Sequence, residues 1–120
     1  MENNVYYLRG DNVALLLNKY INSCGVEVEN GYFELTEVSY NSTIKALTFS
    51  GDIWMSKEIK DEGFNPVDHF EEGFELHNLP DKNIFDVVYD YIIDLSKNDL
   101  EYLEENFPKY IGFIGCEEIK

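Results

Sequence analysis

The first strong hydrophobic pattern in the chain lies between residues 13 and 24. Its apolar positions recur every three or four residues, as they do on one face of a helix, at Val13, Leu16, Leu17, Tyr20, Ile21 and Cys24. Asp11 or Asn12 stands before this pattern as an N-cap, and Gly25 follows it as a stop. The spacing therefore predicts an N-terminal helix.

An alternating pattern comes next. Residues 26–29 alternate apolar with charged side chains, and residues 32–40 are rich in the aromatic and β-branched residues that favour strands. Asn30-Gly31, which lies between them, is typical of a type I′ turn. Together these features predict a β-hairpin.

The strand pattern changes in two further places. The inward-facing apolar set of the second hairpin strand shifts phase partway along, and a β-bulge near Thr36 or Glu37 would explain the shift. Residues 44–49 and 53–55 predict further strand, bent or reversed at residues 50–52. We therefore expect an antiparallel β-meander of three to four strands.

The second half of the chain is predicted to be mainly helical after an irregular segment. Residues 56–82 show no sustained period. Asn83 then begins an amphipathic helix, whose apolar positions are Ile84, Val87, Val88, Tyr91, Ile92 and Leu95. Asn98 caps a second, short helix that Pro108 ends, and residues 110–116 predict a final strand.

These elements predict one α+β domain that spans residues 1–120. It has an N-terminal helix, the antiparallel meander, two C-terminal helices and a final short strand, with the helices packed on the sheet. Hydrophobic residues make up 44% and aromatic residues 15% of the 120 positions, enough for a buried core. We therefore expect a folded chain despite a net charge of −15.

The negative charge is concentrated in the second half of the chain. Residues 1–56 hold 7 acidic and 3 basic residues, whereas residues 57–120 hold 17 acidic and 6 basic residues. Such a field repels nucleic acids and anionic membranes and attracts basic proteins. We therefore expect a basic protein surface as the partner, without direct contact to nucleic acid or membrane. Residues 1–4 lack the features of a signal peptide, which predicts a cytoplasmic protein.

Six carboxylates recur at helical spacing in the predicted C-terminal helices: Asp86, Asp90, Asp94, Glu101, Glu104 and Glu105. The first three recur every four residues, which places them on one helix face about 6 Å apart. Like charges at this spacing destabilise a helix by about 0.2–0.5 kcal/mol per pair, so folding alone does not favour them. We interpret the six as a partner-binding surface that mimics nucleic-acid phosphates. The alternative is a solvated face that only adds solubility.

Both histidines lie in one acidic segment. His69 and His77 stand among carboxylates, and imidazole with carboxylate can bind zinc or iron. Their spacing matches no established metal motif, and the sequence has no Cys-x-x-Cys pair, phosphate-binding loop or nucleophile elbow. Cys24 and Cys116 predict small buried thiols. We therefore predict no metal, no cofactor and no catalytic residue, and favour a binding protein over an enzyme.

The leading hypothesis is a small inhibitor, immunity protein or anti-defence protein that blocks a basic partner, such as a nucleic-acid-binding one. The composition is similar to that of small acidic phage and mobile-element proteins, including anti-CRISPR inhibitors. Tyr6, Tyr7 and Tyr89 lie outside the periodic apolar sets, and they are either candidate interface residues or residues that cover the edges of the core. Two alternatives stay open. One is a metal-dependent enzyme or binding protein that uses the His69–His77 segment, and the other is a subunit of a larger assembly.

Overall fold

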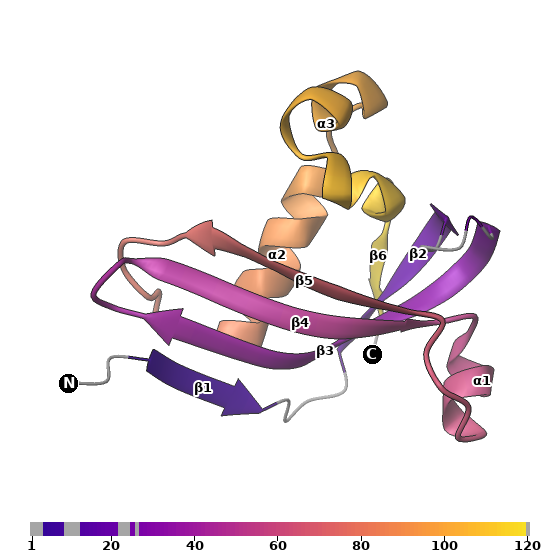
Figure 1. Cartoon of the computed structure of the whole chain (residues 1–120), viewed down its shortest axis with the longest axis horizontal. Helices are drawn as coiled ribbons and strands as arrows, with labels where there is room; N and C mark the ends of the chain where they lie inside the picture. The colour runs from indigo at the N-terminus through magenta and orange to yellow at the C-terminus, as the bar shows by residue number, and fades with distance from the viewer. Residues whose placement is uncertain (1–3, 9–12, 22–24, 26, 120) are drawn as a thin grey trace.

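The computed structural model describes residues 4–8, 13–21, 25 and 27–119 (Figure 1). The elements follow in the order β1 (Asn4–Leu8), β2 (Ala14–Ile21), β3 (Glu27–Asn41), β4 (Ala46–Trp54), α1 (Lys57–Asp61), β5 (Asp68–Glu75), α2 (Ile84–Ser96), α3 (Leu100–Asn106), the 3₁₀ helix η1 (Pro108–Phe113) and β6 (Glu117–Ile119). The described strands form one antiparallel sheet, and α2 lies across one of its faces (Figure 1). The chain is therefore α+β.

The long strand β3 organises the sheet. The strand order is β5-β4-β3-β2-β6, and β1 also pairs with β3. β4 follows one edge of β3, while β2 pairs with its first half and β1 with its second half. The pairing with β4 shifts register between Leu35 and Glu37. This shift confirms the predicted bulge near Thr36 or Glu37.

The main core lies between α2 and the sheet. Asn83 begins α2, because its Oδ1 accepts a hydrogen bond of 2.8 Å from the Phe85 N–H. The predicted start of this helix is therefore confirmed. The helix buries its apolar face against an aromatic cluster, in which the rings of Phe33 and Phe113 meet edge to face at 5.1 Å.

A smaller cluster forms on the opposite face of the sheet, at one end. Ala14, Tyr32 and Trp54 are buried there. Lys60 of α1 covers this cluster, with its Nζ 5.5 Å from the centroid of the Trp54 ring and 3.6 Å from Glu34 Oε2. No other described helix covers this face (Figure 1).

The predicted N-terminal helix is wrong, because residues 14–21 form strand β2. Leu15 and Leu17 enter the main core, while Ala14 enters the smaller cluster on the opposite face. A strand that is buried on both faces has apolar residues at consecutive positions, and such a run also fits helical spacing. The predicted caps Asp11 and Asn12 lie outside the described residues.

The predicted hairpin turn at Asn30-Gly31 is also wrong, because both residues lie inside β3. Asn30 has a φ of 56°, so it adopts the left-handed conformation within a strand that keeps its register with β2. The predicted break at residues 50–52 is wrong as well, since β4 runs through it. Gly51 is required there by packing: a Cβ atom would lie 2.6 Å from Cζ of Phe33.

The remaining corrections concern the second half of the chain. Residues 56–82 are not irregular throughout, because they contain α1 and β5. Asp99 caps α3, one residue later than the predicted cap Asn98, and Pro108 opens η1. Residues 110–116 do not form the predicted final strand, since β6 begins at residue 117. Among the described residues, no helix has the length and apolarity needed to cross a membrane.

Candidate functional site

The three aspartates of α2 lie on the face of the helix that points away from the core. Val88 and Ile92 are buried against the sheet, whereas Asp90 and Asp94 are exposed and Asp86 is half-buried. This arrangement follows from the four-residue interval, which returns each carboxylate to the same side of the helix. The structure thus places the α2 carboxylates in one row along the outside of the molecule.

Two lysines partly neutralise this row. The Lys82 ammonium donates a hydrogen bond to Asp90, and this bond raises the pKa of Lys82, with further contributions from the charges of Asp86 and Asp94. Lys97 Nζ lies 3.8 Å from Asp94 Oδ1. These pairs are exposed, so each contributes little to stability. The two lysines make the row less negative than its three carboxylates alone would be.

The glutamates of α3 form the less neutralised part of the acidic surface. Glu101, Glu104 and Glu105 are all exposed, and none makes an ion pair within the described part of the chain. α3 stands beyond the C-terminal end of α2 and away from the sheet (Figure 1). The short helix buries only Leu103 among its residues.

Two apolar side chains accompany these glutamates. Leu100 is 48% exposed and Tyr102 is 44% exposed. Tyrosine is enriched at protein interfaces, so the exposed Tyr102 adds apolar contact area beside the carboxylates.

The two histidines lie near opposite ends of β5. His69 Nδ1 lies 2.7 Å from Asp52 Oδ1 on β4, and this hydrogen bond is the main reason that the pKa of His69 is raised. Glu71 adds a weaker contact at 3.4 Å. His77 Nε2 lies 2.5 Å from Glu75 Oε1. Within the described residues, no three metal-binding side chains come together. The segment proposed for metal binding thus forms β5 and the residues that follow it, and its two histidines contact different carboxylates.

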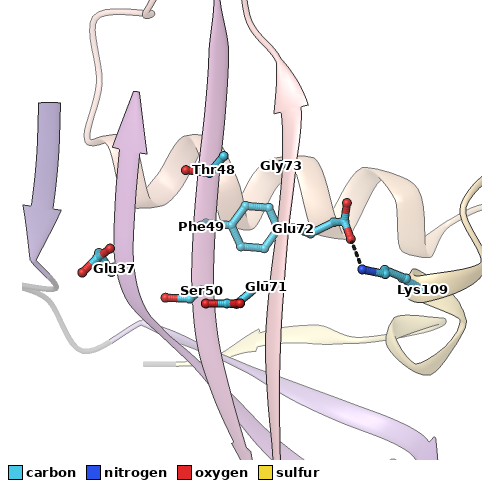
Figure 2. A pocket seen from close by; sticks show the side chains of 8 residues that line it. All are labelled: Glu37, Thr48, Phe49, Ser50, Glu71, Glu72, Gly73 and Lys109. Atoms are coloured by element: carbon cyan, nitrogen blue, oxygen red, sulfur yellow. Dashed lines mark ion pairs between the residues drawn. The ribbon is translucent and has the colours of Figure 1, made fainter. Parts of the chain in front are cut away.

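A polar hollow opens over β4 and β5, and most of its lining residues lie on the face of the sheet opposite α2, which we call the open face (Figure 2). Its volume is about 440 Å³, and its lining residues are Glu37, Thr48, Phe49, Ser50, Glu71, Glu72, Gly73 and Lys109. Strand register explains the lining: Glu37, Ser50 and Glu71 form one row across β3, β4 and β5. Gly73 in the next row has no side chain to fill the space. The hollow can accommodate a cationic side chain between the carboxylates of the row.

Glu72 belongs to the other side of β5. Its partner in the sheet is Phe49, and its carboxylate lies 2.9 Å from Lys109 Nζ of η1 (Figure 2). This ion pair connects β5 to the segment after α3. Periodicity could not have found it, because the two residues are far apart in the sequence and neither belongs to a local motif.

Cys116 is buried, as predicted, and burial raises the pKa of its thiol. A thiol with a raised pKa is a poor nucleophile at neutral pH, because the reactive form is the thiolate. Cys24 lies outside the described residues.

No known protein family, no curated protein and no solved structure matches this chain.

Proposed function

We propose that this protein binds a basic partner protein through the acidic surface of α2 and α3, and so acts as an inhibitor, immunity protein or anti-defence protein. The partner is a protein with a cationic surface, such as one that binds nucleic acid. One observation carries the proposal. Six carboxylates lie on two consecutive helices, five of them are exposed, and among the described residues two lysines pair with them.

The expected physical effect of this surface is on recognition and association rate. Each exposed ion pair contributes only about 0–1 kcal/mol, so a single contact cannot provide the affinity. A group of like charges instead attracts an oppositely charged surface over about 8 Å at physiological salt. Leu100 and Tyr102 beside the α3 glutamates then supply apolar area that is buried on contact.

Affinity capture from the source cell at low and high salt tests this proposal. The bait is the full chain, compared with two variants in which three carboxylates become amides: D86N/D90N/D94N and E101Q/E104Q/E105Q. A matched control, E58Q/E62Q/D81N, removes three exposed charges elsewhere. We expect salt to elute a basic partner, each surface variant to bind it at least about tenfold more weakly, and the control to bind within about twofold.

Two results would contradict the proposal. One is a partner that stays bound at high salt and binds the surface variants as well as the wild type. The other is an equal loss of binding in the control, because a general effect of net charge would then explain the result. Circular dichroism of each variant verifies that the fold is retained.

A further inference from the structure

β5 is an edge strand of the sheet. It pairs with β4 along Asp68–Glu75, and within the described part of the chain no strand lies on its other side. An edge strand exposes backbone N–H and C=O groups that can pair with another strand.

The hydrogen-bond pattern shows which groups these are. The Leu76 N–H donates to the Lys45 carbonyl at 2.8 Å, so these two residues form a hydrogen-bonded pair of the antiparallel ladder. Such pairs alternate with non-hydrogen-bonded pairs. The intervening residues of β5 therefore direct their N–H and C=O groups away from β4, and among them are Glu71, Gly73 and Glu75.

One outward group at the start of the strand has a partner. The His69 N–H donates to the Asp68 carboxylate at 3.0 Å. The N–H groups of Glu71, Gly73 and Glu75 make no such contact with the described residues. Three donors spaced two residues apart are thus available for an incoming strand.

The side chains beside these donors are acidic. Glu71 and Glu75 are 73% and 70% exposed, and β5 contains no lysine or arginine. Charged residues on an edge strand prevent it from pairing with a second copy of itself. The same carboxylates favour a strand that carries lysine or arginine, because opposite charges across a strand pair are stabilising.

The other side of the edge carries two phenylalanines with an ion pair between them, because Glu72 lies between Phe70 and Phe74 and pairs with Lys109 at 2.9 Å. Phe74 stacks on Tyr91 of α2 with ring centroids 3.8 Å apart, and both rings are half-buried. A strand added to β5 would therefore meet the carboxylates of Glu71 and Glu75 on the open face. On the side of α2 it would meet aromatic rings and a carboxylate that Lys109 already neutralises. Its complementary sequence alternates basic with apolar residues.

We propose that the β5 edge binds an extended segment of a partner protein by strand addition, with lysine or arginine at every second position and apolar residues between them. Backbone hydrogen bonds provide the docking, and the alternating side chains provide the selectivity. The inference rests on the proposed function only in the basic character of the partner, because β5 and the α2–α3 surface are different elements.

The test uses the full chain and three synthetic nine-residue peptides. One alternates lysine with valine, one alternates glutamate with valine, and one is the lysine peptide with N-methyl groups that block its pairing edge. NMR reports the amide exchange of Glu71, Gly73 and Glu75. We expect the lysine peptide to slow these three amides at least about tenfold, and each control peptide to bind at least about tenfold more weakly.

Two variants at one position separate the backbone contribution from the charge. E71P removes an outward N–H that β4 does not use, whereas E71Q keeps that N–H and removes only the charge. We expect E71P to lower the affinity for the lysine peptide at least about tenfold, and E71Q to lower it only about two- to threefold. If E71P does not fold, amide exchange in the wild type still decides the question.

The outcomes also separate this inference from the proposed function. If the lysine peptide binds at α2 and α3, and this binding disappears in D86N/D90N/D94N, strand addition is overturned and the proposed function is unaffected. If the lysine peptide still slows the β5 amides of that variant, and the variant still captures the partner as the wild type does, strand addition is supported. The proposed role of the α2–α3 surface in binding is then contradicted. Equal binding of all three peptides, or no binding of the lysine peptide, would overturn strand addition.

Discussion

Replacement of Tyr89 by phenylalanine tests how α2 is fixed to the sheet. Tyr89 is 1% exposed, and its hydroxyl bridges two backbone segments that are distant in the sequence. It accepts a hydrogen bond of 2.9 Å from the Leu35 N–H, at the bulge of β3, and donates one of 2.9 Å to the Val13 carbonyl. Y89F removes this bridge and leaves the ring in place.

The expected loss follows from the burial of these groups. A buried donor left without a partner costs about 1–3 kcal/mol, and the lost bond to Val13 contributes about 0.5–1.5 kcal/mol more. We therefore expect Y89F to lower the free energy of unfolding by about 2–4 kcal/mol, a large fraction of the roughly 5–15 kcal/mol typical of a domain. At an m value of about 2 kcal/mol/M, the urea midpoint falls by about 1–2 M.

Urea unfolding followed by circular dichroism and Trp54 fluorescence measures this change. Tyr91 offers a matched control, because it lies two residues further along the same helix and its hydroxyl makes no hydrogen bond with the described residues. We expect Y91F to change the free energy of unfolding by less than about 0.5 kcal/mol. A Y89F midpoint equal to that of Y91F would refute the bridging role of Tyr89.

Three further predictions concern other parts of the chain. The buried Tyr110 hydroxyl has no partner among the described residues, so Y110F should stabilise the protein by about 1 kcal/mol in the same assay; a loss of that size would contradict this. The pKa of His69 should exceed about 6.5 in an NMR titration and should fall in D52N. The stability that this pair provides should be present below about pH 6.5 and lost as the pH rises through the folded pKa. An unchanged titration midpoint of His69 in D52N would contradict the assignment. G51A should lower the free energy of unfolding by about 1–3 kcal/mol, since its Cβ would clash with the Phe33 ring; wild-type stability would contradict it.

The elements that the sequence predicts correctly are those that local signals determine. α2 has a capping asparagine and a regular apolar face, and both act within a few residues of each other. The bulge of β3 is also visible locally, because the inward-facing set changes phase around Thr36. Such features depend little on the rest of the fold.

The elements that the sequence misses depend on distant contacts. Ala14 and Leu15 are both buried only because Trp54 and the main core lie on opposite faces of β2. β5 lacks a clear alternation, since Glu72 lies on the side of α2, where Lys109 pairs with it. Neither environment can be inferred from residues nearby in the chain.

The candidate site shows the same division. Helical spacing is sufficient to place Asp90 and Asp94 in one row, but it does not show that Lys82 pairs with Asp90 across eight positions. The sequence left two interpretations of Tyr89 open for a related reason, and the structure shows this residue buried in the core and not exposed at a surface. Lys97, three residues after Asp94, was the one neutralising contact that the sequence pattern could have indicated.

The salt dependence of the affinity between this protein and its captured partner tests the central claim most directly. The wild type, the combined variant of all six α2 and α3 carboxylates, and the control E58Q/E62Q/D81N are each measured from low to high salt. We predict that the wild type and the control lose affinity steeply with salt, and that the six-site variant binds weakly with a much shallower dependence. Equal slopes and equal affinities for all three proteins would contradict the claim that these carboxylates form the binding surface.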